Sequence, residues 1–146
     1  MIYNGTIEKK IRFLEDELEM IEDWEITNYS KFKKSSLEKA AVEKALTVCV
    51  QIMIDICERI LAINKKPPKN TTVENLEQIV KLKAIKSSEK YIEIFKFRNF
   101  VVHRYENIDP AITFNIVKNE LNLHREFIDE IRTFCSNNDK KEKENL

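Results

Sequence analysis

The chain has 146 residues, of which 42% are hydrophobic, enough for one compact domain that needs no staple to fold. Its 25 basic residues balance its 25 acidic ones, so no overall field draws the protein onto nucleic acid or a membrane surface. One Gly and three Pro are too few for a strand-and-turn architecture, whereas abundant Glu, Lys, Leu, Ile and Ala favour helix. The composition therefore predicts an all-α fold with short connections.

The first ten residues lack the uninterrupted apolar run of a signal peptide, and no stretch approaches the roughly 20 apolar residues of a membrane span. Cys49, Cys57 and Cys135 show no CxxC spacing and stand in apolar helical patterns, where a thiol behaves as a small hydrophobe. We expect reduced core cysteines rather than redox or metal sites. We therefore expect a cytoplasmic protein with no membrane partner.

Apolar residues from Ile7 to Ile21 recur four and three apart, which predicts a first helix from Thr6 to about Trp24. Trp24 either anchors the core at the end of this helix, which we favour, or lines a site. A second apolar pattern predicts one long helix from about residue 31 to residue 63. The loop that follows, residues 64–70, contains two prolines that forbid continuation of the helix.

Thr71, with Glu74 three residues later, predicts a capping box for a short third helix. Ser87 or Ser88 is expected to cap a fourth helix, whose inner side carries four apolar or aromatic residues: Tyr91, Ile94, Phe95 and Val102. Because Ser and Thr oxygens accept hydrogen bonds from free backbone N–H groups, both positions indicate helix starts.

Asp109 followed by Pro110 predicts the start of a fifth helix, which continues to about Phe134. The last ten residues are almost wholly polar, and we expect them to fray because they bury too little apolar surface. We therefore predict a single domain over residues 1–136, a charged tail over 137–146, and about five helices in an up-and-down bundle.

Residues capable of chemistry gather in segment 97–105. At 100° per residue, Arg98 and Tyr105 share a face about 10 Å apart along the axis, while Asn99 and His103 are i, i+4 neighbours. Arg98 and His103 lie about 140° apart around one regular helix, too far to hold one phosphate easily. Either the helix unwinds near His103, or a second copy faces the first across a two-fold axis, which we prefer.

These residue types suit RNA cleavage without a metal ion. A histidine takes the proton from a ribose 2′-hydroxyl or protonates the leaving 5′-oxygen, and an arginine binds the phosphate and stabilises the charge of the transition state. On residue types alone, however, a surface arginine and a capping or core histidine are the more frequent explanation. The case from first principles is therefore modest.

Two further residues are open to more than one interpretation. His124 has no partner pattern, and we interpret it as a solvated helix residue rather than a site residue. Asp55 lies in the most apolar part of the second helix, where an unpaired carboxylate is costly. It either faces a donor, for which Arg98 and Tyr105 are the candidates, or lies on the solvent side of the helix.

The arrangement Arg98-Asn99, three residues, His103, one residue, Tyr105 resembles the Arg-polar-x-x-x-His-x-Tyr signature of the HepT-like proteins of the HEPN superfamily. The resemblance extends over about residues 37–131. It includes segments 41–46 and 54–57, which resemble the family's second helix, and two further positions: Pro67 in its loop and Ile108-Asp109 after the signature.

This resemblance implies a HEPN bundle that forms a homodimer, with Arg98 and His103 as the catalytic pair and Asn99 as their support. It implies the toxin of a toxin–antitoxin system, an endoribonuclease that uses no metal or cofactor and cleaves tRNA or mRNA by 2′-hydroxyl attack. Tyr105 is then the residue that a cognate nucleotidyltransferase antitoxin of the MntA kind modifies with AMP.

Two features depart from the family pattern. Arg104 stands where the family often has a small residue, and it either adds a phosphate contact or crowds the cleft. Residues 1–29 are the least family-like part. The alternative function is a non-catalytic HEPN module that binds a nucleotide or scaffolds the partner transferase through the same cleft, but the complete Arg, Asn, His and Tyr set favours the enzyme.

Overall fold

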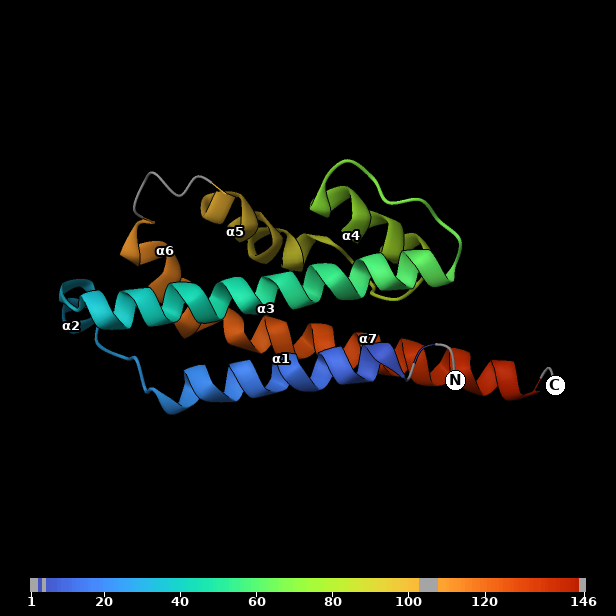
Figure 1. Cartoon of the computed structure of the whole chain (residues 1–146), viewed down its shortest axis with the longest axis horizontal. Coiled ribbons are helices and arrows are strands. Elements are labelled where there is room, and N and C mark those ends of the chain that lie inside the picture. Colours follow the sequence, from blue (N-terminus) through green and yellow to red (C-terminus); the bar gives the residue numbers. More distant parts are fainter. Residues whose placement is uncertain (1–2, 4, 103–107, 145–146) are drawn as a thin grey trace.

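The computed structural model describes Tyr3, residues 5–102 and residues 108–144, apart from the side chains of residues 100–102, 142 and 143. Every regular element in this part of the chain is helical, which confirms the all-α prediction. Three long helices run along the molecule: α1 (Thr6–Asp23), α3 (Ser36–Ile63) and α7 (Leu121–Glu144). Three shorter ones form a second row against α3: α4 (Thr72–Lys81), α5 (Ile92–Val102) and α6 (Pro110–Asn115) (Figure 1).

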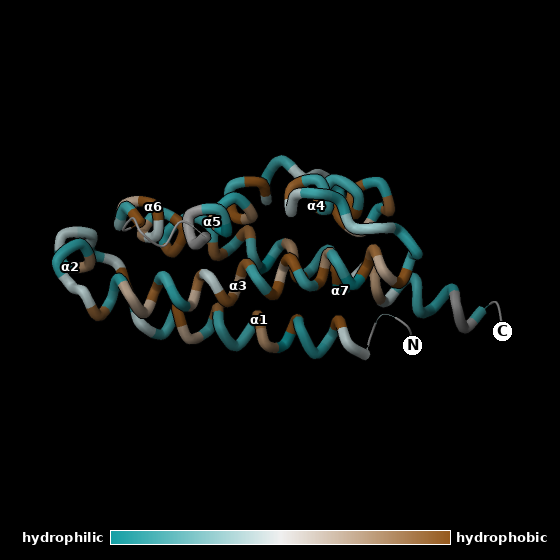
Figure 2. The backbone as a smooth tube through the Cα atoms, turned by 45° about the horizontal axis from the view of Figure 1, so that its top comes forward, coloured by the Kyte–Doolittle hydropathy of each residue, from teal (hydrophilic) through white to brown (hydrophobic). Residues whose placement is uncertain are grey.

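The helix α3 is the centre of the bundle. It packs against α1 on one side and against α4 and α5 on another. Eleven of its 28 residues are buried: Val42, Ala45, Leu46, Cys49, Val50, Met53, Ile54, Ile56, Cys57, Ile60 and Leu61. Apolar residues recur along each of the long helices between polar ones (Figure 2), as expected for helices that bury one face.

The long second helix expected over residues 31–63 is interrupted. A short helix α2 (Tyr29–Lys34) comes first, and the backbone of Ser35 is extended, with φ −94° and ψ 106°. The Ser35 hydroxyl accepts a hydrogen bond from the Glu38 N–H at 3.1 Å, which caps α3. The apolar pattern does not reveal this break, because the serine competes locally for the backbone donor that a continuous helix would use.

Two other predicted helix starts are confirmed by their capping hydrogen bonds. The Thr71 hydroxyl accepts from the Glu74 N–H at 3.1 Å, and the Asp109 carboxylate accepts from the Ala111 N–H at 2.9 Å. At the predicted fourth helix, a 3₁₀ turn η1 (Glu89–Tyr91) leads into α5. The side chain of its N-cap residue Ser88 makes no capping hydrogen bond, although the Ser87 hydroxyl accepts from the Glu89 N–H at 3.3 Å. These caps depend on neighbours in the sequence, so the sequence reveals them.

The predicted fifth helix consists of three parts. After α6 the chain forms a π-helical turn, η2 (Ile116–Glu120), and then α7, which continues to Glu144. The helix therefore extends through most of the segment expected to fray. Asp139 is buried within that segment, and its carboxylate accepts a hydrogen bond from the Tyr3 N–H at 3.0 Å. This contact with the N-terminal end of the chain helps to hold the polar segment in the helix, which its own apolar surface is too small to do.

The C-terminal ends of α3 and α4 lack the glycine that usually allows a left-handed residue. Lys65 and Lys83 have φ of 55° and 67°. The Lys66 N–H donates to Leu61 O and the Ala84 N–H donates to Ile79 O, both at 2.9 Å, which is the six-residue hydrogen bond of a Schellman motif. The left-handed backbone conformation is less stable for a lysine than for glycine, by about 1 kcal/mol at each position.

Trp24 does not anchor the core as we favoured. Its side chain is 36% exposed at the C-terminal end of α1, whereas Ile21 one turn earlier is fully buried. The helix ends there, and the residues that follow turn away to α2, which leaves part of the indole exposed. The position of this tryptophan at a helix end therefore did not reveal how exposed its side chain is.

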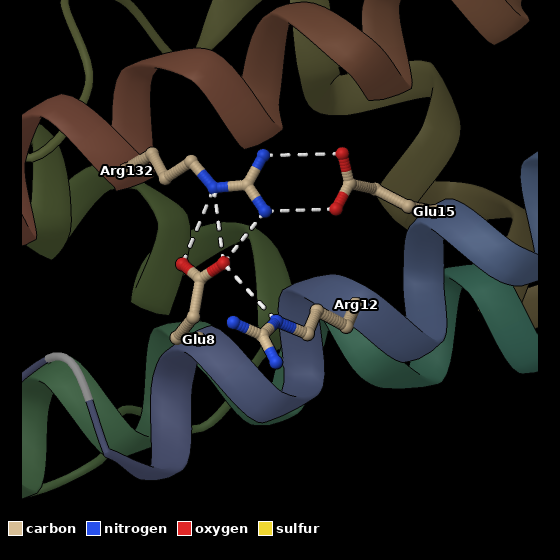
Figure 3. A network of polar contacts seen from close by, with 4 residues as sticks. All are labelled: Glu8, Arg12, Glu15 and Arg132. Carbon is tan, nitrogen blue, oxygen red and sulfur yellow. Dashed lines mark hydrogen bonds and ion pairs between the residues drawn. The ribbon is translucent and has the colours of Figure 1, made fainter.

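Acidic residues on α1 and arginines on α7 hold these two antiparallel helices together. Arg132 donates to the carboxylates of both Glu8 and Glu15, with Nη2 2.7 Å and 2.8 Å from their Oε1 atoms (Figure 3). Seven residues earlier on α7, Arg125 Nε donates to Glu22 at 3.1 Å. The matching spacing of seven residues on both helices fixes their register. Hydrogen bonding from Arg132 lowers the pKa of Glu15, which indicates that the carboxylate is held as an anion.

We expect Arg132→Ala to lower the free energy of unfolding by about 1 kcal/mol, because a bidentate pair in a network exceeds the usual value of a surface ion pair. Urea unfolding of the full chain at neutral pH measures this change. Arg12→Ala is the matched control, since Arg12 Nε lies 3.6 Å from Glu8 and its side chain is 76% exposed. An equal effect of both substitutions would contradict a specific role for the Arg132 network.

Candidate active site on the fifth helix

The N-terminal end of α5 is attached to α7 by polar contacts. The Tyr91 hydroxyl donates a hydrogen bond to the carboxylate of Glu130, which also accepts from the Lys86 N–H at 3.0 Å. Lys90 Nζ lies 3.9 Å from the same carboxylate. Burial, then the hydrogen bond to Glu130, raises the pKa of Tyr91, so this hydroxyl stays protonated and remains a donor. The start of the helix that carries the candidate site is therefore firmly positioned.

The inner face of α5 is apolar up to the candidate site. Ile94, Phe95 and Phe97 are buried, and the Phe95 ring packs edge-on against Phe127 of α7, with ring centroids 6.1 Å apart. Arg98 lies only about 40° around the helix from Ile94, so it belongs to this inner face, and its side chain is half-buried. The arginine thus follows directly on the core residues of its helix.

Arg98 and Asn99 differ in their surroundings. Arg98 is half-buried, yet it forms no ion pair with any acidic residue in the described part of the chain. Asn99, rotated by about 100°, is exposed. A half-buried guanidinium without an acidic partner leaves its donors available for an anion from outside the chain.

Asp55 does not pair with Arg98, which was one of its two candidate partners. Its Oδ1 accepts a hydrogen bond from Gln51 Nε2 at 2.9 Å, one turn earlier on α3, and the residue is half-buried. The second candidate, Tyr105, lies outside the described residues. Asp55 is therefore satisfied within its own helix, and the described structure does not bring it together with Arg98.

The remaining residues of the candidate site, His103, Arg104 and Tyr105, also lie outside the described residues, as does the side chain of Val102. The segment that contains them joins the end of α5 at Val102 to the start of α6 at Pro110. Their roles, and the choice between an unwound helix and a site shared by two copies, remain predictions.

A hollow of about 330 Å³ lies between α5 and the α6–η2 segment, next to the candidate site. Glu93 and Phe97 of α5 line one side, and Ile116 and Glu120 line the other. Glu120 Oε2 is buried and has no hydrogen-bond partner among the described residues. Burial, then the charge of Glu93, raises the pKa of Glu120. A larger hollow, about 480 Å³, lies elsewhere, between residues 82–86 and α7.

His124 is a core residue, so its interpretation as a solvated helix residue is wrong. The side chain is 1% exposed, and its Nδ1 lies 2.7 Å from the carbonyl oxygen of Glu120 in the π-helical turn. Because a carbonyl only accepts, Nδ1 carries the hydrogen and Nε2 is unprotonated. Burial lowers the pKa of His124 to about 4, so the ring is neutral at physiological pH. Helical periodicity could have signalled this burial, because Leu121, Phe127 and Ile128 stand three and four residues from the histidine and are buried.

The cysteine prediction is confirmed, because Cys49, Cys57 and Cys135 are free and buried. Burial raises the pKa of all three thiols, to about 12 for Cys49 and Cys135, so none is a reactive thiolate. In the described part of the chain, no three His, Cys, Asp or Glu residues lie together in a way that suits a metal ion. Within residues 5–102 and 108–144, no helix has both the length and the apolar character of a membrane span.

Solved structures with the same fold include toxins of the HEPN class. The tri-AMPylated HEPN toxin of Shewanella oneidensis, in complex with its MNT antitoxin, matches with a TM-score of 0.78 and 22% identity, over 89% of this chain and 98% of that one. A toxin–antitoxin structure with AMP-PNP matches with a TM-score of 0.78 and 21% identity, over 87% and 97%. The cytosolic protein YutE from Bacillus subtilis matches with a TM-score of 0.78 and 15% identity, over 92% of each chain.

These likenesses define the protein as an all-helical bundle with the fold of HEPN toxins. The family described as ribonuclease HepT-like matches residues 14–131, which is most of the chain, and the chain belongs to this family. The match begins earlier than the resemblance over residues 37–131 suggested, and it takes in the second half of α1. No curated protein sequence matches the chain.

The buried His124 should make stability depend on pH. Its folded pKa of about 4 lies below the unfolded value of 6.5, so the stabilisation is complete above pH 6.5 and is lost as the pH falls toward 4. Between pH 7.5 and pH 5 the loss from this residue should be about 2 kcal/mol. Urea unfolding at both pH values, for the native chain and His124→Gln, measures it. Equal pH dependence in the two proteins would show that His124 does not carry the effect.

Proposed function

We propose that the protein is the toxin of a toxin–antitoxin system and acts as a metal-independent endoribonuclease at a site shared by two copies of the chain. Membership of the ribonuclease HepT-like family supports the reaction class. The observation that carries the proposal within the structure is Arg98, a half-buried guanidinium at the end of an apolar helix face, without an acidic partner in the described part of the chain.

Arg98 would bind the scissile phosphate. Its planar fork of donors matches two phosphate oxygens, and partial burial strengthens this interaction because less water competes for the charge. The pentavalent transition state carries more negative charge than the bound phosphate, so the same contact lowers the barrier to cleavage. Asn99, exposed on the adjoining face, is the candidate for supporting hydrogen bonds.

His103 would transfer the protons. One imidazole takes the proton from the ribose 2′-hydroxyl, the resulting oxyanion attacks the phosphorus, and the 5′-oxygen leaves with a proton from a second acid, which leaves a 2′,3′-cyclic phosphate. A homodimer that brings two α5 helices together would supply the histidine of each copy for one of these two tasks. This arrangement also removes the separation of about 140° between Arg98 and His103 on a single helix.

Tyr105 would be the site of regulation. The partner would be a nucleotidyltransferase antitoxin of the MntA kind, and AMP on the tyrosine would place a phosphodiester and a nucleotide beside Arg98, where they compete with RNA. The AMPylated state of the Shewanella oneidensis HEPN toxin supports this form of control. The free thiols of the chain favour a cytoplasmic location, where RNA is available.

The second candidate function is a HEPN module without catalysis, which binds a nucleotide or holds the transferase through Arg98 and His103. The absence of an acidic partner for Arg98 in the described residues suits any phosphate ligand, and therefore suits this function too. The presence of histidine and tyrosine at positions 103 and 105 favours the enzyme, because binding alone needs neither.

We expect the purified chain to cleave RNA in EDTA, and we expect His103→Ala or Arg98→Ala to reduce the cleavage rate at least about 10²-fold, the usual scale for losing a proton-transfer or charge-stabilising group. Cleavage of total tRNA and of a messenger RNA, followed by detection of the 2′,3′-cyclic end, measures this. Growth arrest on expression should disappear with the same substitutions.

Lys96→Ala is the matched control, because Lys96 is an exposed cation of the same helix whose Nζ lies 3.9 Å from Glu93. Its loss should leave cleavage nearly unchanged. Intact RNA with the native chain and with every variant would exclude the nuclease and leave the binding module.

We expect Tyr105→Phe to cleave RNA at nearly the native rate and to resist inactivation by the cognate transferase with ATP, because only the acceptor oxygen is removed. Mass spectrometry of the intact chain, with and without the transferase, counts the added AMP groups. Tyr29→Phe is the control, since the Tyr29 ring packs against Phe114 of α6, with ring centroids 5.2 Å apart. AMP on Tyr105→Phe at the native level would remove Tyr105 from this role.

A further inference from the structure

One side of α1 exposes three large apolar residues in a row. Phe13 is 55% exposed, Met20 38% and Trp24 36%. Their spacings of seven and four residues place them within about 40° of one another around the helix, so they form a single stripe. Solvent-exposed aromatic and methionine side chains on one face are typical of surfaces that bind another protein.

The stripe lies beside α3, so it is part of a wider surface. The helices α1 and α3 pack against each other and run in opposite directions (Figure 1). The half-buried residues Ala41, Val48 and Ile52 of α3 are seven and four residues apart, so they share one face of that helix. Leu37, 82% exposed, lies near the start of α3. We call this surface the α1–α3 face; in Figure 1, α7 crosses behind these two helices.

Charge is distributed unevenly along the same helix. The N-terminal half of α1 carries Lys9 and Lys10 near the stripe. The rest of the helix is acidic there, because Glu17 and Glu19 flank the stripe and Asp23 and Glu25 stand at the C-terminal end. Lys9, Lys10, Asp23 and Glu25 form no ion pair with another side chain in the described part of the chain. A helix that is basic at one end and acidic at the other complements a second copy of itself in the reverse direction.

We propose that the α1–α3 face binds the same face of a second copy of this chain, with the two α1 helices antiparallel across a two-fold axis. The basic end of each α1 then lies against the acidic end of the other, and Phe13 of one copy approaches Trp24 of the other. An isologous contact of this kind needs a self-complementary surface, and the reversed charge along the stripe provides it.

This interface is separate from the proposed active site. Arg98 lies on α5, which packs on a different side of α3 from α1. Copies that are also joined through α5 therefore form an assembly larger than a dimer. The α1 contact does not depend on nuclease activity, so the test of this interface is independent of the test of the proposed function.

Charge reversal tests the electrostatic part of the interface. The chain Lys9→Glu/Lys10→Glu should form assemblies of half the native mass in light scattering at equal concentration. Adding Asp23→Lys/Glu25→Lys to the same chain should restore the native mass, because complementarity returns with the signs exchanged. Lys65→Glu/Lys66→Glu, in the exposed loop after α3, is the matched control and should keep the native mass.

Disulfide trapping tests whether the two α1 helices are antiparallel in the interface. Phe13→Cys mixed with Trp24→Cys should give a covalent dimer on mild oxidation, while Phe13→Cys alone should give little, because two copies of residue 13 lie on opposite sides of the axis. The native cysteines are buried and do not compete. A monomeric native chain, or a mass that the charge reversals leave unchanged, would overturn the proposal. Equal trapping of Phe13→Cys alone would also overturn it, as would an α1–α3 face that is buried only when the transferase is bound.

Discussion

The burial of α3 determines where every other element lies. Its apolar surface is too wide for one neighbour, so α1 covers one side while α4 and α5 cover another. Fully burying a side chain such as leucine or isoleucine contributes about 1.5–3 kcal/mol, so the buried residues of α3 represent the largest share of the driving force for folding. The candidate arginine occupies a defined position because its helix, α5, is one of those that cover the apolar surface of α3.

The position of the site also depends on contacts at the far end of α5. The hydrogen bond between Tyr91 and Glu130 and the packing of Phe95 on Phe127 both attach α5 to α7. The α7 helix is in turn fixed to α1 through Arg132 and Arg125. Arg98 is therefore held by a chain of contacts that begins in the acidic face of α1. The candidate arginine, on a helix of eleven residues, is thus positioned without an acidic partner of its own among the described residues.

Local signals in the sequence predicted much of the fold. Thr71 and Asp109 cap helices through hydrogen bonds to residues two or three positions away, and the sequence displays both partners together. The Arg132 network was not predictable in this way, because its partners are 117 and 124 residues distant along the chain. The buried Asp139 was missed for the same reason, since its donor is Tyr3 at the other terminus.

The candidate site was predictable only in part. Helical periodicity placed Arg98 and Asn99 on different faces of one helix, as the structure has them. The partner of Asp55 was not foreseen, because Gln51 on its own helix satisfies it at less cost than a residue of another helix. His124 was misjudged although the sequence places it on the apolar face of α7, with Leu121, Phe127 and Ile128 three and four residues away. The interpretation considered only its immediate neighbours, which are polar or partly exposed.

The π-helical turn between α6 and α7 sets how α7 is rotated relative to α6. A turn of this kind contains one residue more than an α-helical turn, so all residues after it are displaced by about 100° around the axis. The helical segments α6, η2 and α7 follow one another directly, so the turn sets how the side of α6 that contains Thr113 lies relative to the side of α7 that contains His124. Loss of a single residue from Ile116–Glu120 would therefore turn the apolar side of α7, as far as Cys135, by about 100° relative to α6.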